Sequence, residues 1–260
     1  MTNATLEIIA RRRSVRAYAD RPLTQIEKDA ILQATLRAPT AGNMMLYTII
    51  EIEDQALKDR LAVSCDDQSF IARAPFVLLF AADYQRWFDL FIYDQAPERA
   101  AALGIQPRTP QEGDLMLAVC DTLIAAQTAV IAAESLGIAS CYIGDILENY
   151  EIHRDLLGLP KYVLPVTLLC FGYPQQELSD KQPVPRFDRK FIVHRNAYHR
   201  LDQAELQEML AAREAQAQGR YGNDAHNLGQ SVYLRKFVSA FSVEMSRSVA
   251  EMICSWCARE

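Results

Sequence analysis

The pattern of hydrophobic and polar positions along the chain predicts four strands. Residues 46–53 (LYTIIEIE) are rich in branched side chains, which is typical of a strand. Residues 74–83 (APFVLLFAAD) are apolar on both faces, as expected of a central strand. Residues 138–145 and 163–174 form two further apolar runs of strand type. The chain therefore carries enough strands for one central sheet.

Helical periodicity accounts for most of the remaining pattern. A short helix is predicted over residues 3–12, and Thr24 with Glu27 has the spacing of a capping box that begins a helix ending before Pro39. Residues 114–137 form the longest predicted helix. It is apolar almost all the way round, so we expect it to be buried on every side, partly in a subunit interface. Further helices are predicted over 146–158, 202–218 and 230–258.

Two segments do not follow these patterns. Residues 84–112 carry several aromatic side chains and are predicted to be a partly helical excursion, whose aromatics can serve as core, pocket wall or lid. From residue 175 the chain becomes polar and contains prolines. We predict a core over 1–200 and a C-terminal helical extension over 201–260 that packs on the core or on a partner subunit.

Composition narrows the class of protein. Half of the 260 residues are hydrophobic and the formal net charge is -6, which is ordinary globular content and argues against nucleic acid as a partner. No uncharged apolar run reaches the ~18 residues of a membrane span, and the N-terminal residues lack a signal-peptide pattern. We therefore expect a cytoplasmic protein without a membrane partner, whose six cysteines are free thiols.

One cysteine pair has a spacing that occurs in redox and metal sites. Cys254 and Cys257 form CSWC, but the pair lies late in a helical pattern and has no second pair to complete a zinc site. We interpret it as two cysteines on successive helical turns, and we expect no metal site.

The stretch RRRSVRAY, residues 11–18, concentrates four arginines in an acidic chain. Guanidinium groups offer paired N–H donors, so this segment can bind one phosphate; a solvated basic patch is the alternative. Three later stretches, APTAGN (38–43), ESLGIASCYIGD (134–145) and PRFDRKFIVHRNAY (185–198), occur in the order found in a known family. Together the four resemble the FMN-dependent nitroreductases, in particular the larger branch of oxygen-insensitive nitroreductases and flavin reductases that favour NADPH. Residues 232–249 resemble the C-terminal helical arm of that branch.

The resemblance implies a fold, a cofactor and an assembly. The fold is α+β and nitroreductase-like, with a mixed four- to five-stranded sheet flanked by helices, in an intertwined homodimer with a C-terminal helical arm. Each of two FMN molecules contacts both subunits. NAD(P)H, with NADPH favoured, reduces the flavin, which then reduces nitroaromatics, quinones or other flavins by ping-pong kinetics. No side chain need act as a catalytic residue.

The resemblance also implies positions for the cofactor-binding residues. The phosphate and ribityl contacts are Arg12, Arg13, Ser14 and Arg16, with Arg186 as a second basic contact. The loop that reaches the flavin of the other subunit holds Pro39, Thr40, Ala41 and Asn43. Gln68 faces the pyrimidine edge of the ring, and Tyr142, Ile143 and Gly144 lie over one ring face. The extra phosphate of NADPH can meet Arg213, Arg220 or Arg235.

Two positions depart from the family pattern. Val184 stands where many relatives have lysine, a loss for which Lys181, Arg189 or Lys190 can compensate. Asp145 replaces a glycine; because a carboxylate near the ring disfavours anionic reduced flavin, we expect Asp145 to point away or to cap the next helix. Two other functions stay open: a different flavin reaction on the same fold, such as reductive dehalogenation, and a non-catalytic regulator that binds a nucleotide or anion.

Overall fold

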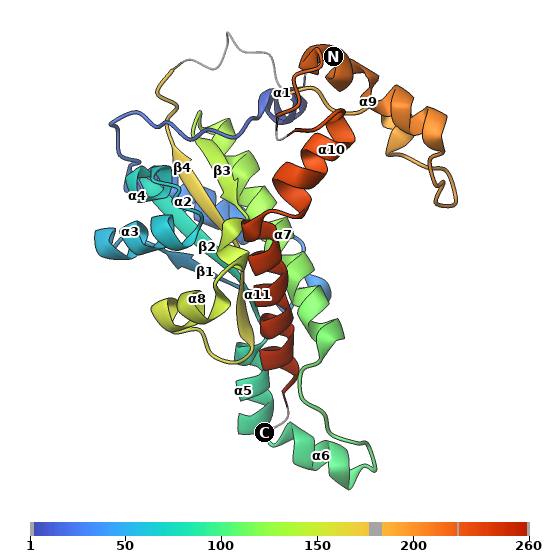
Figure 1. Ribbon diagram of the computed structural model, residues 1–260. Coiled ribbons are helices and arrows are strands. Elements are labelled where there is room, and N and C mark those ends of the chain that lie inside the picture. The colour runs from blue at the N-terminus through green and yellow to red at the C-terminus, as the bar shows by residue number, and fades with distance from the viewer. Residues whose placement is uncertain (1–2, 177–183, 223, 259–260) are drawn as a thin grey trace. The chain divides into compact units, whose positions relative to one another are not determined.

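The computed structural model describes residues 3–176, 184–222 and 224–258, which form two compact units. The first unit comprises residues 1–182 with 244–260, and the second comprises residues 183–243 (Figure 1). Lys181 lies outside the described residues. The predicted division into a core over residues 1–200 and a helical extension over 201–260 stays a prediction.

The first unit is built on a sheet of four described strands. These are β1 (Tyr47–Glu51), β2 (Phe76–Asp83), β3 (Ala139–Ile143) and β4 (Val163–Gly172), in the order β1-β2-β4-β3. The four strands were predicted, but the mixed sheet was wrong: every strand pair described is antiparallel. The described parallel pairing is an isolated bridge between Ser14 and Ser140. The central strands β2 and β4 are buried along their whole length, as their apolar sequences predict.

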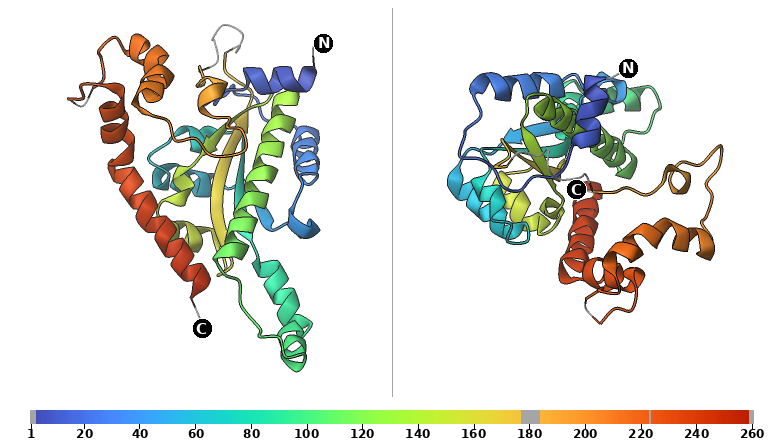
Figure 2. Two further views of the ribbon diagram at one scale, coloured as in Figure 1. Left: turned by 90° about the vertical axis from the view of Figure 1, so that its right-hand side faces the viewer. Right: turned by 90° about the horizontal axis from the view of Figure 1, so that it is seen from above.

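Helices cover both faces of this sheet (Figure 2). Leu78 and Phe80 pack with α2 (Gln25–Thr35) and α7 (Glu112–Ser135), whereas Val77 and Leu79 point to the opposite face. That opposite core includes residues of α3 (Gln55–Ser64), α4 (Phe70–Arg73) and the end of α8 (Tyr150–Leu157). The remaining elements of this unit are α1 (Ala4–Arg11), α5 (Gln85–Tyr93), α6 (Ala96–Ala102), η1 (Ala41–Asn43) and η2 (Asp145–Leu147). The capping box of Thr24 and Glu27 is formed.

The long helix α7 is buried along one face within a single chain, and the expected burial of its other face in a subunit interface stays a prediction. Ala125, Ala129 and Val130 are fully buried against the sheet, while Met116 and Leu123 remain 64% and 44% exposed. By length and composition alone this helix could cross a membrane, but its buried face is part of the core. The exposed apolar face of α7 is the surface that the predicted subunit interface would cover.

The second unit is mostly helical. It holds η4 (Arg189–Phe191), α9 (Gln203–Ala217), α10 (Leu228–Val232) and a π-helical turn η5 (Tyr233–Phe237). The predicted helix over 230–258 is interrupted after this turn, and α11 (Ala240–Cys257) then begins and continues into the first unit. Ser239 precedes α11, and its carbonyl accepts the backbone N–H of Val243. This hydrogen bond begins α11 as a helix separate from the π-helical turn η5.

The CSWC pair lies at the end of α11, as its helical interpretation predicts. Cys254 is exposed and Cys257 is half-buried; both are free thiols. Between them, Trp256 is fully buried and its indole N–H donates to the carbonyl of Gln111 at 3.2 Å. The aromatic side chain therefore anchors this end of α11 to the chain just before α7.

Candidate functional site

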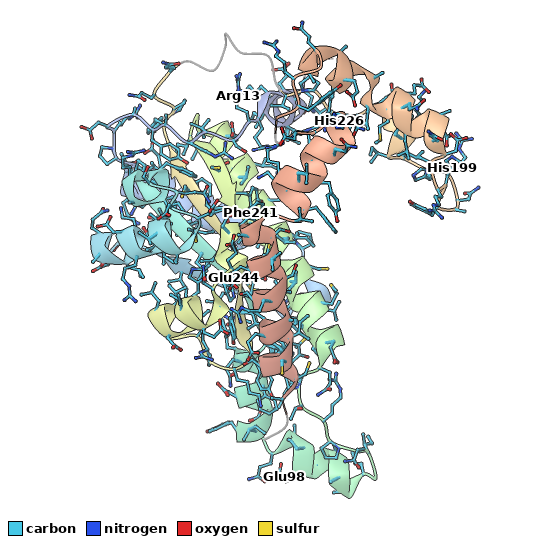
Figure 3. The ribbon with its side chains drawn as sticks, in the orientation of Figure 1. Arg13, Glu98, His199, His226, Phe241 and Glu244 are labelled. Carbon is cyan, nitrogen blue, oxygen red and sulfur yellow. The ribbon has the colours of Figure 1, made fainter. Side chains whose placement is uncertain are left out.

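The arginine segment lies along one edge of β3. Residues 12–16 follow α1, and the backbone N–H of Val15 donates to the carbonyl of Ser140 at 3.0 Å. Val15 is buried, whereas its neighbours Ser14 and Arg16 are exposed, which is the alternation of an extended segment. Figure 3 labels Arg13, whose segment follows α1.

Three of the predicted phosphate contacts, Arg12, Ser14 and Arg16, affect the pKa of Cys141 in β3. Burial raises the pKa of Cys141, while Arg16, a hydrogen bond with Ser14, and Arg12 oppose that rise. These cations and this hydroxyl therefore lie close enough together to act on one group. An anion at this edge would meet guanidinium donors and a hydroxyl, which is the chemistry that a phosphate requires.

Buried polar atoms at this edge lack partners among the described residues. They are Arg12 Nη1, Glu134 Oε1 and Ser140 Oγ. Burial raises the pKa of Glu134, and the nearby Arg12 and Arg11 partly oppose the rise. A buried guanidinium nitrogen without an acceptor is rare and costly. The segment therefore fits an FMN phosphate, whose oxygens would accept from Arg12.

The predicted loop around Thr40 is tied to α7 by an acidic residue that the sequence analysis missed. Asp121 is 3% exposed and accepts the backbone N–H groups of Ala41 and Leu46 at 2.9 and 3.2 Å, as well as the hydroxyl of Thr40. Asn43 has a left-handed φ of 58°. The signal for Asp121 was present in the sequence: it is a charged residue on the buried face of an otherwise apolar helix.

This loop does not meet the arginine segment within one chain. Thr40 donates a hydrogen bond to Asp121 of α7, whereas Arg12 opposes the rise in the pKa of Glu134 near the other end of that helix. These positions are 13 residues apart, about 20 Å along the helix axis. Pro39, Thr40, Ala41 and Asn43 are therefore separated from Arg12, Ser14 and Arg16 within one chain, and their role toward a second subunit's flavin stays a prediction.

The ring-side residues lie at the other end of β3. Tyr142 and Ile143 end the strand, and Gly144 leads directly into η2. The hydroxyl of Tyr142 donates to Gln127 Oε1 of α7 at 3.2 Å, and burial raises the pKa of Tyr142 to about 12.

Asp145 does not cap η2, because it is the first residue of that helix and Gly144 is the N-cap. Its carboxylate accepts the side-chain amide of Gln68 at 2.6 Å. Its orientation relative to the flavin stays a prediction. Gln68 and Asp145 are both half-buried, and the contact joins the segment between α3 and α4 to the start of η2, just after β3. Gln68 is thereby brought to the same strand end as Tyr142 and Ile143.

A second buried acid lies behind Asp145. Glu148 is 5% exposed, and burial together with the hydrogen-bonded carboxylate of Asp145 raises the pKa of Glu148 to about 7. His153 is fully buried on α8, where burial lowers its pKa; its Nδ1 lies 3.0 Å from the carbonyl of Ile146 and its Nε2 lies 2.8 Å from Ser64 Oγ. Neither residue was singled out by the sequence analysis, because both lie in an unremarkable polar helix pattern.

The remaining predicted contacts belong to the second unit. Arg186 and Arg189 are exposed there, as is Val184 at 68%. The guanidinium of Arg213 stacks over the ring of Phe187, 4.0 Å from its centroid. Their roles toward phosphate or NADPH stay predictions.

Comparison with known proteins identifies the fold that carries this arrangement. Residues 9–173 match the nitroreductase family. The chain belongs to the nitroreductase family. It is 35% identical to the oxygen-insensitive NADPH nitroreductase of Salmonella typhimurium over 80% of this chain and 81% of that protein. It is 32% identical to an FMN reductase [NAD(P)H] of Bacillus subtilis over 88% of this chain and 90% of the relative.

A solved structure shares the fold of this nitroreductase family member along the full chain. Nitroreductase A from Vibrio parahaemolyticus superimposes with a TM-score of 0.81, at 24% identity and with complete coverage of both chains. The predicted α+β class and family are therefore confirmed.

Proposed function

We propose that this nitroreductase family member is an FMN-dependent NAD(P)H oxidoreductase of nitroreductase or flavin reductase type. The observation that carries the proposal is a buried guanidinium nitrogen of Arg12 that has no partner in the described part of the chain, in the segment with Ser14 and Arg16 at one edge of β3. It is supported by relatives whose names specify NADPH, FMN and flavin chemistry. When bound, FMN supplies the capacity to accept and donate a hydride.

The residues of this chain bind and orient the cofactor in this proposal. Arg12, Ser14 and Arg16 hold the phosphate, and Arg13 joins them. Gln68 faces the pyrimidine edge of the ring, while Tyr142, Ile143 and Gly144 cover one ring face. Arg186 and Arg189 are further proposed basic contacts to the phosphate. The other ring face stays open to flat, electron-poor acceptors, and NADPH is the favoured donor.

Two copies of the chain are needed to complete each site. The loop of Pro39, Thr40, Ala41 and Asn43 is about 20 Å along α7 from the phosphate segment of its own chain, so it serves a partner's flavin. The exposed apolar face of α7 supports the same assembly, as does an apolar cavity of about 410 Å³ between α7, β4 and α11. A cytoplasmic homodimer with a C-terminal helical arm is thus part of the proposal.

The visible spectrum of the purified protein tests the proposed function. Bound FMN gives a yellow protein that absorbs near ~450 nm, and NADPH under argon should bleach that band. Subsequent addition of a quinone or nitroaromatic should restore the band. A colourless protein that binds a nucleotide or anion without redox change would contradict the proposal. It would instead support a non-catalytic regulator.

A further inference from the structure

The side-chain amide of Gln68 is held between two hydrogen-bond acceptors. Its Nε2 donates to Asp145 Oδ2 at 2.6 Å and to the backbone carbonyl of Cys65 at 2.8 Å. Cys65 is fully buried at the end of α3, so the carbonyl is a rigid partner. Both described hydrogen bonds of the Gln68 side chain thus use its nitrogen.

The chemistry of these partners determines how the amide is oriented. A carbonyl oxygen and a carboxylate oxygen can only accept, so neither can pair with the amide oxygen of Gln68. Turning the amide over would place oxygen against oxygen at both contacts. The amide oxygen Oε1 must therefore point away from Asp145 and Cys65 and act as an acceptor for whatever lies beyond.

We propose that Asp145 is a positioning residue that holds Gln68 as a hydrogen-bond acceptor and thereby selects the N3–H group of the flavin. The inference rests on the proposed function, because it requires flavin beside Gln68. The pyrimidine edge of an oxidised flavin carries one N–H donor, at N3, and acceptors at N1, O2, O4 and N5. A clamped amide oxygen can pair only with the donor; a freely rotating amide could pair with either kind of group.

The test compares the dissociation constants of FMN and of N3-methyl FMN for the wild-type protein and for Asp145→Ala. Methylation removes the N3–H and leaves the clamped oxygen without a donor, so wild type should bind the methylated cofactor about tenfold or more weakly. In Asp145→Ala only the carbonyl of Cys65 still holds Nε2, so turning the amide over costs one unfavourable contact instead of two, and the ratio should fall to about threefold or less. The ratio cancels the loss of the carboxylate charge, since both flavins carry the same charge.

Further variants make the outcome decisive. Gln68→Ala should lower the ratio as Asp145→Ala does, and Asp145→Gly serves if the alanine variant does not fold. Asp67→Asn removes an exposed carboxylate one residue from Gln68 and should leave the ratio at its wild-type value. An unchanged ratio in Asp145→Ala or Asp145→Gly, with FMN still bound, overturns the role of Asp145 alone. Failure of wild type to bind either flavin overturns the proposed function, and the inference with it.

Discussion

Arg16 and Arg12 lie at the same edge of β3 but differ in burial, since Arg16 is exposed and Arg12 is half-buried. If Arg16 contacts the phosphate, Arg16→Ala should weaken FMN binding by about 1.5–3 kcal/mol, roughly tenfold to a hundredfold. Riboflavin lacks the phosphate, so its affinity should change far less. Fluorescence titration with both flavins measures the difference.

The neighbouring arginine provides the matched control. Arg11 is exposed and lies outside the predicted contacts, so Arg11→Ala should leave both affinities nearly unchanged. Equal losses for FMN and riboflavin in Arg16→Ala would mean that this arginine shapes the pocket rather than binding phosphate. Arg12→Ala should resemble Arg16→Ala, with the additional effect that Glu134 loses a nearby cation.

Glu148 should make the stability of the fold depend on pH. Its pKa is raised from an ordinary value of 4.5 to about 7, first by burial and then by Asp145, Asp66 and Glu244. Between these two values the folded state keeps the proton that the unfolded state has lost. The free energy of unfolding should therefore be highest below about pH 4.5. It should fall by about 3 kcal/mol at most as the pH rises to about 7, and then level off.

Glu148→Gln should remove this dependence, because glutamine does not titrate. Urea unfolding at several pH values between 5 and 8, on wild type and variant, measures it. As the pH rises, the unfolding free energy of the wild type should fall relative to that of Glu148→Gln. A difference that stays constant across this range would show that Glu148 is not protonated in the folded protein.

The connection between α7 and the loop before β1 depends on one buried carboxylate. Asp121 accepts from Thr40, Ala41 and Leu46, so Asp121→Asn should weaken these contacts and leave an amide N–H₂ facing backbone donors. We expect a loss of about 1–3 kcal/mol in unfolding free energy, together with weaker FMN binding. Leu46→Ala, which truncates a buried side chain at the same loop but spares Asp121, separates general destabilisation from loss of the clamp. Equal flavin affinity in Asp121→Asn and wild type would remove Asp121 from the positioning of this loop.

The CSWC pair at the end of α11 should be dispensable for activity. Cys254 and Cys257 are free thiols on a helix whose anchor is the buried Trp256. The double change Cys254→Ser and Cys257→Ser should leave NADPH:quinone turnover within a few-fold of wild type. Trp256→Ala, which removes the fully buried indole between them, should cost about 3–5 kcal/mol of stability. Lost turnover in the double serine variant with FMN still bound would assign the cysteines a redox role.

At the scale of the whole molecule, the exposed apolar face of α7 is the proposed contact between two subunits. Ile124 is 40% exposed in the single chain, so Ile124→Glu should disturb a second copy rather than the chain's own core. Burying an unpaired carboxylate costs several kcal/mol, enough to break an interface. Sedimentation and the flavin spectrum should therefore show dimer and bound FMN lost together.

A matched control places the same charge elsewhere on the surface. Ile26→Glu changes an 82% exposed isoleucine in the first turn of α2 and should keep both dimer and flavin. Ala129 is unsuitable as a probe, because it is fully buried in the chain's own core and a charge there would unfold the subunit. A folded, flavin-bound monomer of Ile124→Glu at micromolar concentration would contradict the shared site.

The sequence by itself determined the features that depend on neighbours in the chain. Four strands, the capping box of α2, the long apolar α7 and the arginine segment were all readable, because alternation, helical spacing and local charge leave a direct signature. The motif order also carried the family, which the comparison confirmed. The signals for the strands, the helices and the arginine segment are short in range, because each is set by residues within a few turns or one strand.

Only the tertiary structure decided which distant groups meet. It made every described strand pair antiparallel, left one face of α7 open in the single chain, and brought Asp145 to Gln68 and Asp121 to Thr40. Asp145 was expected to point away from the ring or to cap the next helix; the structure assigns the cap to Gly144 and gives the Asp145 carboxylate a hydrogen bond from Gln68. Such contacts join residues 77 and 81 positions apart, and their formation depends on how the sheet and helices pack, which no local pattern records.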